Sequence, residues 1–209
     1  MGTRYHPVTC INSLAGGPAI LRIVQATLDD QTEVRHLFHE YLTGVKAILT
    51  QEYGITLDVD AMVDKAIQAM PMFLPPVGRL LLAYRGDALA GCAGLHTLSP
   101  SIAELKRMYV RPAYRRQGIG GALLDAVVAE SRRMGIRTLR LDTSRHMPEA
   151  HALYRSKGFL EREPYDESEV PKQVHQYTVF MEMPLEPHPP DNPFRPPENT
   201  ATALGKGTS

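Results

Sequence analysis

One stretch of the sequence decides the fold, because it runs from a strand through a basic, glycine-rich loop into a helix. It reads Tyr109-Val110-Arg111-Pro112-Ala113-Tyr114-Arg115-Arg116-Gln117-Gly118-Ile119-Gly120-Gly121. Glycines let a ligand approach the backbone closely, the first N–H groups of a helix have no intrahelical acceptors, and the helix dipole places positive potential there. Arg115 and Arg116 add positive charge. The stretch therefore predicts an anion-binding site at the start of the helix.

Two other phosphate-binding patterns are excluded by the letters of the sequence. A GxGxxG dinucleotide fingerprint would need glycine at the position of Leu123, and the chain contains no GxxxxGK[ST]. The pair Gly118 and Gly120 could also serve only as a tight turn between strand and helix. Other residues of the sequence must therefore decide whether the two glycines form an anion site or only a turn.

Hydrophobic periodicity places further elements on both sides of this stretch. Ile119, Ala122, Leu123, Ala126 and Val127 recur at helical spacing over 118–134, and Gly135 is placed to end that helix. The other expected elements are strands at 21–26, 80–84, 88–97, 102–110, 137–143 and 176–183, and helices beginning at Asp29 or Asp30, over about 58–70, and over 148–157. The strands at 80–84 and 88–97 should form an antiparallel hairpin. This order predicts an α/β fold of the mixed α+β kind, with a mostly antiparallel twisted sheet of about six to seven strands and helices on both faces.

Length and composition indicate a single folded domain with two tails. The chain has 209 residues, of which 43% are hydrophobic and 22% charged, as in ordinary globular proteins. Residues 1–19 show no periodicity and are expected to be a flexible leader. Seven of the fourteen residues from Pro184 to Pro197 are proline, so 186–209 is expected to be a disordered tail. Residues 20–185 form the expected domain.

Charge and cysteine content limit the partners and the compartment. Lys plus Arg equal Asp plus Glu at 23 each, so no global field favours nucleic acid or a membrane surface as a partner. Cys10 and Cys92 are the two cysteines, which argues against a disulfide framework. The first residues lack the apolar core of a signal peptide, and no apolar run is long enough to span a membrane. We therefore expect a cytoplasmic protein.

Two separate motifs resemble the GNAT superfamily of N-acetyltransferases. Arg115, Gly118 and Gly120 match its R/Q-x-x-G-x-G/A signature, and Ala150-His151-Ala152-Leu153-Tyr154-Arg155-Ser156-Lys157-Gly158-Phe159 looks like its A-x-x-LY-x-x-x-GF helix. The resemblance covers 20–185 and implies acetyl-CoA as cosubstrate. It implies CoA contacts through Met108, Tyr109, Val110, Arg115, Arg116, Gln117, Gly118, Ile119, Gly120, Gly121 and Tyr154. The chain departs from the pattern at Met147, where many relatives have asparagine.

Tyr154 and Glu104 are the candidate catalytic residues. A phenol with a pKa of about 10 can donate a proton to the departing thiolate or orient the sulfur, although Tyr154 could equally be a core tyrosine. Strand alternation places Glu104, Lys106 and Met108 on one face and Leu105, Arg107 and Tyr109 on the other. Glu104 is the candidate base, acting directly or through water, and the alternative is an ion pair with Lys106 or Arg107.

Other polar and apolar residues have less specific patterns. His96, Asp142 and Thr143 end strands and are candidates for the acceptor pocket, as are the loop Phe73-Leu74-Pro75-Pro76 and Tyr165, each with a structural alternative. The pairs His36 with His39 and His146 with His151 lack a third ligand at metal spacing, so no metal is expected. Cys92 lies in an apolar strand and is expected to be inert.

These observations predict transfer of an acetyl group from acetyl-CoA to a primary amine by direct attack in a ternary complex. A small-molecule acceptor is preferred because no recognition domain is appended to the expected fold. Two alternatives stay open: an acetyltransferase acting on protein lysines or N-termini, and a non-catalytic CoA-binding module. The identity of the acceptor and the formation of a homodimer are left open as well.

Overall fold

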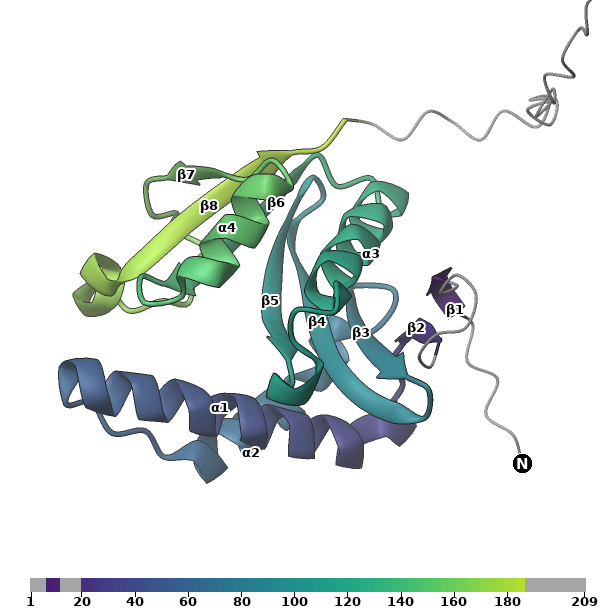
Figure 1. Cartoon of the computed structure of the whole chain (residues 1–209). Coiled ribbons are helices and arrows are strands. Elements are labelled where there is room, and N and C mark those ends of the chain that lie inside the picture. Colours follow the sequence, from purple (N-terminus) through teal and green to yellow (C-terminus); the bar gives the residue numbers. More distant parts are fainter. Residues whose placement is uncertain (1–6, 12–19, 187–209) are drawn as a thin grey trace, which may run out of the picture.

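The computed structural model describes residues 7–11 and 20–186, and within them one sheet of eight strands is flanked by four α-helices (Figure 1). The strands are β1 (Pro7–Ile11), β2 (Leu21–Gln25), β3 (Gly78–Arg85), β4 (Ala88–Ser99), β5 (Ile102–Val110), β6 (Thr138–Ser144), β7 (Leu160–Arg162) and β8 (Thr178–Pro184). The α-helices are α1 (Gln31–Tyr53), α2 (Val59–Gln68), α3 (Ile119–Arg133) and α4 (Pro148–Ser156), and the 3₁₀ helices are η1 (Leu28–Asp30), η2 (Met70–Phe73), η3 (Pro112–Tyr114) and η4 (Lys172–Tyr177).

The sheet is mixed and mostly antiparallel, as the sequence predicts. Its strand order is β1-β2-β3-β4-β5-β6-β8-β7, and β5 with β6 is the one parallel pair among these strands. The expected hairpin is formed by β3 and β4. Because β6 is reached from β5 through α3, the crossover helix lies against the sheet and its N-terminus comes directly after β5.

Helices cover both faces of the sheet, which confirms the predicted layers (Figure 1). The apolar faces of α1 and α2 pack on one side against β2, β3 and β4, in a cluster that includes Val34, Phe38 and Leu82. On the opposite side α3 and α4 pack in a second cluster that includes Leu123 and Tyr154. All five residues of the predicted α3 stripe are buried. The two apolar clusters hold the sheet between them.

Strands β1 and β7 were not predicted from the sequence. Residues 7–11, assigned to a flexible leader, pair antiparallel with β2, so that part of the assignment is wrong. Their β-branched residues favour strand, and β2 would otherwise present an unpaired edge. Strand β7 has three residues, too few to show a period. The remaining leader residues and 187–209 lie outside the described residues, and the domain limits of 20 and 185 remain a prediction.

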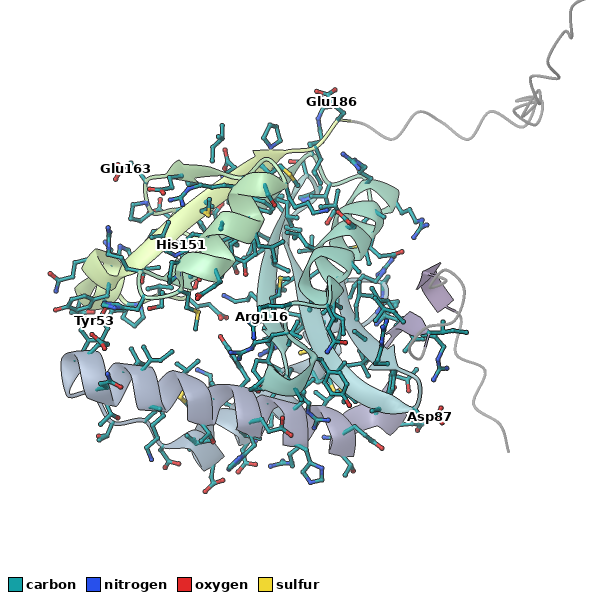
Figure 2. The ribbon with its side chains drawn as sticks, in the orientation of Figure 1. Tyr53, Asp87, Arg116, His151, Glu163 and Glu186 are labelled. Atoms are coloured by element: carbon teal, nitrogen blue, oxygen red, sulfur yellow. The ribbon has the colours of Figure 1, made fainter. Side chains whose placement is uncertain are left out.

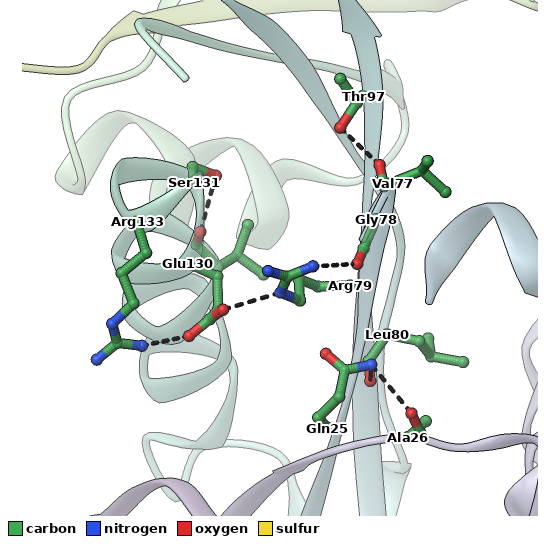
Figure 3. Close-up of polar contacts among 11 residues, drawn as sticks. Gln25, Ala26, Val77, Gly78, Arg79, Leu80, Thr97, Glu130, Ser131 and Arg133 are labelled. Atoms are coloured by element: carbon green, nitrogen blue, oxygen red, sulfur yellow. Dashed lines mark hydrogen bonds and ion pairs between the residues drawn. The ribbon is translucent and has the colours of Figure 1, made fainter. Parts of the chain in front are cut away.

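Helix α3 is fixed to the sheet by a polar cluster near its C-terminal end (Figure 3). Glu130, which is buried, accepts a hydrogen bond of 2.9 Å from Arg79 Nε of β3 and forms an ion pair with Arg133. Ser131 donates to the Val127 carbonyl at 2.8 Å. Beyond the helix, Gly135 has the left-handed φ of 76° that the sequence predicts for a terminating glycine. With its far end fixed, α3 holds its first turn at a set position beyond β5.

Candidate active site

The two parallel strands at the centre of the sheet diverge halfway along their length. Pairing between β5 and β6 runs from Ile102 with Thr138 to Leu105 with Leu141 and then stops, so 106–110 has no partner strand on that side within the described residues. A β-bulge lies at the same place, because Gly94 of β4 pairs with Lys106 whereas Cys92 pairs with Tyr109. Arg107 takes the left-handed φ of 54° there. The bulge turns β5 away from β6 and leaves main-chain groups open beside the site.

Because of the bulge, the side chains of β5 do not alternate between the two faces of the sheet as the sequence predicts. Met108 lies with Leu105 on the α3 side of the sheet, and Tyr109 lies on the opposite side against Tyr41 of α1, with ring centroids 5.6 Å apart. The prediction that Met108 shares a face with Glu104 and Lys106 is therefore wrong. One extra residue in the strand reverses the alternation beyond it and places two consecutive side chains, Lys106 and Arg107, on the same side.

The loop between β5 and α3 has the features expected of an anion site. The N-cap residue Gly118 has a φ of 77° and provides no side-chain cap, and its carbonyl accepts a hydrogen bond of 3.0 Å from the Ala122 N–H. The N–H groups of Ile119, Gly120 and Gly121 are left without helical acceptors. Arg115 and Arg116 are exposed and form no ion pair with described residues, and Figure 2 shows Arg116 at the foot of α3.

The first turn of α3 packs closely against α4, which carries Tyr154. A Cβ placed on Gly120 would lie 3.3 Å from Leu153 Cδ2 and 3.7 Å from Met108 Cε. Tyr154 itself is buried, its ring packs 5.8 Å from that of Phe159, and its hydroxyl donates to Met108 Sδ at 3.7 Å. Burial raises the pKa of Tyr154 above its usual value. The side chain is thus both a core aromatic and a hydroxyl directed at a sulfur atom beside the divergent strands.

A cluster of charged groups lies where β5 and β6 separate. Glu104 is fully buried, accepts a hydrogen bond from the Tyr165 hydroxyl at 2.5 Å, and has its Oε2 atom 2.9 Å from Lys106 Nζ. Lys106 Nζ also lies 3.7 Å from Asp142 Oδ2 and 3.4 Å from Glu169 Oε2. Three carboxylates therefore share one ammonium group, which leaves the cluster acidic.

The pKa values in this cluster are displaced in directions that follow from burial and charge. Burial and the neighbouring Glu104 carboxylate raise the pKa of Asp142 to about 6, against the opposing effect of Lys106. Burial tends to lower the pKa of Lys106, but the three carboxylates outweigh it and raise that pKa. Asp142 retains 23% exposure of its side chain, whereas Glu104 has none. Asp142 is therefore the more accessible carboxylate, with a pKa close to neutrality.

Arg107 lies beside this cluster and stacks on aromatic rings of the α1 side. Its guanidinium carbon is 4.0 Å from the ring centroid of Phe73 and 5.2 Å from that of Phe38. His96 packs on the same Phe73 ring at 5.6 Å. Phe73 and His96 therefore lie beside Arg107, and Asp142 and Tyr165 belong to the charged cluster, while their role in binding the acceptor remains a prediction. Thr143 instead donates to Met147 Sδ at 3.9 Å.

Several residues of the site had no assigned role from the sequence. The sequence pattern marks Lys106 and Arg107 only as possible partners of Glu104, and it assigns no role to Tyr41 or Glu169. The available signal was the run of charges Glu104, Lys106 and Arg107 in a central strand, which is unusual unless that surface lines a cleft. Glu169 lies in a loop, where the sequence carries no periodic signal.

The histidines are dispersed, and Cys92 is enclosed. His39 Nε2 lies 3.4 Å from Asp60 Oδ1, and His146 Nδ1 lies 3.8 Å from Glu52 Oε2. His151 Nε2 lies 3.0 Å from the Ser144 carbonyl oxygen. The described residues contain no group of three or more His, Cys, Asp or Glu side chains placed to hold a metal ion. Burial raises the pKa of the Cys92 thiol to about 12, and its Sγ donates to the Arg107 carbonyl at 3.2 Å.

Comparison with known proteins identifies the family. A model of the Acetyltransferase (GNAT) family matches residues 34–159. The chain belongs to the GNAT family. An uncharacterized N-acetyltransferase of Schizosaccharomyces pombe is 33% identical over 149 residues, which are 70% of this chain and 86% of that protein. The family assignment made from the two motifs is confirmed, and the chain is an N-acetyltransferase.

Solved structures show the same fold. A GNAT-family acetyltransferase from Staphylococcus aureus superposes with a TM-score of 0.63 at 24% identity, over 79% of this chain and 99% of that one. The PaiA N-acetyltransferase of Thermoplasma acidophilum, solved in complex with coenzyme A, superposes with a TM-score of 0.58 at 19% identity, over 78% and 98%. No helix among the described residues of this GNAT protein is long and apolar enough to cross a bilayer.

Proposed function

We propose that this acetyltransferase moves the acetyl group of acetyl-CoA to the primary amine of a small molecule, by direct attack in a ternary complex. The observation that carries the proposal is the arrangement along 106–110 of β5. An exposed candidate anion site lies at one end of this segment, which has no partner strand on the β6 side, and the acidic cluster of Glu104, Asp142 and Glu169 lies at the other. A thioester held along the segment would reach from one to the other.

The loop between β5 and α3 supports acetyl-CoA binding by its free donors. The N–H groups of Ile119, Gly120 and Gly121 and the side chains of Arg115 and Arg116 would hold the pyrophosphate. The main chain of Met108, Tyr109 and Val110 has no partner strand on the β6 side and would pair with the amides of the pantetheine arm, as an added strand pairs with a sheet edge; the Val110 carbonyl now accepts from Arg115 Nε at 3.0 Å. The Thermoplasma acidophilum protein of the same fold was solved in complex with coenzyme A.

Asp142 is the residue we propose as the proton acceptor, with Glu104 as its positioning partner. The amine must lose a proton as its nitrogen attacks the thioester carbonyl carbon, and a base works best with a pKa near the working pH. Asp142 has its pKa raised to about 6 and is partly exposed, whereas both oxygens of Glu104 lie against Tyr165 and Lys106. This assignment favours the ion-pair interpretation of Glu104 over its role as the base.

Tyr154 is proposed to stabilise the departing sulfur. As the C–S bond breaks, electrons pass to sulfur, and a hydroxyl hydrogen bond lowers the energy of the thiolate. The Tyr154 hydroxyl already donates to a sulfur atom, that of Met108. Because burial raises its pKa, Tyr154 stays protonated and is a weak acid, so orientation and hydrogen bonding to sulfur are favoured over full proton transfer.

A direct attack agrees with the surroundings of Cys92. A covalent acetyl-enzyme would need an accessible thiolate, and this buried thiol has a raised pKa of about 12. The amine nitrogen would instead displace the thiolate in one complex that contains both substrates. No acyl group would rest on the protein.

Calorimetry and thiol release test this proposal together. The double variant Arg115→Ala with Arg116→Ala should weaken acetyl-CoA binding at least about tenfold, because two charge-assisted contacts to phosphate are lost. The matched control replaces the exposed Arg132 and Arg137, which changes the net charge equally at a distance from the loop. Thiol release across amino acids, polyamines, aminoglycosides and peptides should then identify a small acceptor. Binding without turnover would favour a CoA-binding module, and turnover of peptides alone a protein acetyltransferase.

A further inference from the structure

Arg107 carries a half-buried positive charge that no described residue neutralises. Its side chain contacts Phe38 and Phe73 through their ring faces, and it takes part in no ion pair or side-chain hydrogen bond within the described residues. Glu169 acts on it electrostatically but forms its ion pair with Lys106 instead. Partly buried charges in proteins are normally paired, so an unpaired guanidinium beside a site points to a ligand that pairs with it.

Stacking leaves the hydrogen-bonding edge of Arg107 available. A guanidinium that lies on a ring face engages its flat surface, and its N–H donors point outward in the plane. The guanidinium carbon lies 4.0 Å from the Phe73 centroid, and this contact limits the movement of the group. The carbonyl of Arg107 accepts a hydrogen bond from Cys92, which helps to fix the backbone at the bulge. The donors are therefore preorganised, and their fork matches the two oxygens of a carboxylate.

The acidic cluster beside Arg107 provides opposite charge for an amine. Glu104, Asp142 and Glu169 outnumber Lys106, so this cluster attracts an ammonium group. The bulge places Lys106 and Arg107 on the same side of β5, which brings the acidic cluster and the free guanidinium together. Glu169 interacts with both cations. A ligand with both charges would be complementary to this surface.

We propose that the acceptor is a small amino acid or a related amine that carries a carboxylate, and that Arg107 binds this carboxylate while the acidic cluster receives the amine. This inference rests on the proposed function and specifies its acceptor. An acceptor without negative charge would leave the guanidinium desolvated and unpaired, which costs binding free energy. Selectivity for the carboxylate follows from that penalty.

The test compares matched acceptors in the thiol-release assay with the full chain and acetyl-CoA. Each pair consists of a free amino acid and its carboxamide, which keeps the amine and the shape but removes the negative charge. At least one free amino acid should have a kcat/KM about 100-fold above that of its carboxamide, because a site built to hydrogen-bond a group discriminates against analogues that lack it.

Variants of Arg107 assign the selectivity to this side chain. Arg107→Gln should bring the carboxylate-to-carboxamide ratio to within about threefold of unity, and Arg107→Lys, which keeps the charge without the fork, should give an intermediate ratio. Arg132→Gln, an exposed change on α3, is the matched control and should keep the wild-type ratio. If Arg107→Gln does not fold, the carboxylate-to-carboxamide ratios of the wild type and of Arg107→Lys still test the role of Arg107.

The outcomes separate this inference from the proposed function. Equal use of free acids and carboxamides, or turnover only of amines that lack a carboxylate, overturns the role of Arg107 and leaves small-amine acetylation intact. A wild-type ratio in Arg107→Gln overturns it as well. Absence of thiol release with every small amine contradicts the proposed function itself.

Discussion

Glu104→Gln separates two roles for the carboxylate at the centre of the acidic cluster. The substitution keeps the volume and an acceptor for the Tyr165 hydroxyl but removes the charge that faces Lys106 Nζ at 2.9 Å. Breaking a buried ion pair costs about 3–5 kcal/mol when the remaining charge is left alone. Here Lys106 keeps Asp142 at 3.7 Å and Glu169 at 3.4 Å. We therefore expect a smaller loss, about 2 kcal/mol, or a decrease in Tm of about 4–8 °C.

The pH dependence of kcat/KM in Glu104→Gln shows whether Asp142 or Glu104 is the base. The Glu104 carboxylate helps to raise the pKa of Asp142 to about 6, so its removal should lower that pKa. If Asp142 is the base, the acidic limb of the kcat/KM profile should move to lower pH by roughly one unit. If Glu104 is the base, activity should instead fall most at low pH and recover as rising pH deprotonates the amine in solution.

The assay measures kcat/KM for thiol release from about pH 5 to about pH 9, alongside thermal unfolding. Glu163→Gln makes the same chemical change at an exposed position (Figure 2) and serves as the control for both measurements. A low-pH deficit that disappears at high pH would refute the assignment of Asp142 and return the role of base to Glu104. An unchanged Tm would refute the ion-pair argument.

Three further variants test other parts of the site. Tyr154→Phe should lower kcat by about 10 to 1000-fold with little change in acetyl-CoA affinity, since only the hydroxyl is removed, and wild-type turnover would assign the residue to packing. Gly120→Trp should weaken acetyl-CoA binding at least about tenfold in calorimetry, because its side chain meets Leu153 and covers the free N–H groups, whereas Gly44→Trp, at a position with open space, should not. Asp142→Asn should gain stability relative to wild type as pH rises from about 4 to about 6 and should keep that gain at higher pH, because burial raises the folded pKa of Asp142 to about 6 and folding then disfavours its ionised form. A Tm difference between Asp142→Asn and wild type that stays constant with pH would contradict this.

The fold could be predicted from the sequence because its main elements have strong local signals. The stripe of α3 and the hairpin of β3 and β4 each combine a clear period with turn or cap residues, and these elements appear as predicted. Strands β1 and β7 lack such signals, because a short edge strand is stabilised by the neighbour to which its backbone bonds. That neighbour is known only once the sheet is assembled.

The proposed cofactor-binding half of the site has a local sequence signal, whereas the proposed acceptor half does not. The anion site depends on a contiguous segment, from Arg115 to Gly121, so the sequence displays it directly. The acidic cluster brings together Glu104, Asp142 and Glu169 from two strands and a loop, and its position relative to Arg107 depends on the bulge there. A bulge leaves no mark in the alternation of residues, which is why the predicted faces of β5 failed beyond it.

The central claim, direct acetyl transfer in a ternary complex, is tested most directly by two-substrate initial velocities. Thiol release is measured while acetyl-CoA and the best acceptor of the amine panel are varied against each other. Direct attack predicts double-reciprocal lines that intersect, since both substrates must be bound before the thiol leaves, and the buried Cys92 provides no accessible nucleophile. Parallel lines, with acetyl-enzyme accumulating when the amine is withheld, would contradict the account.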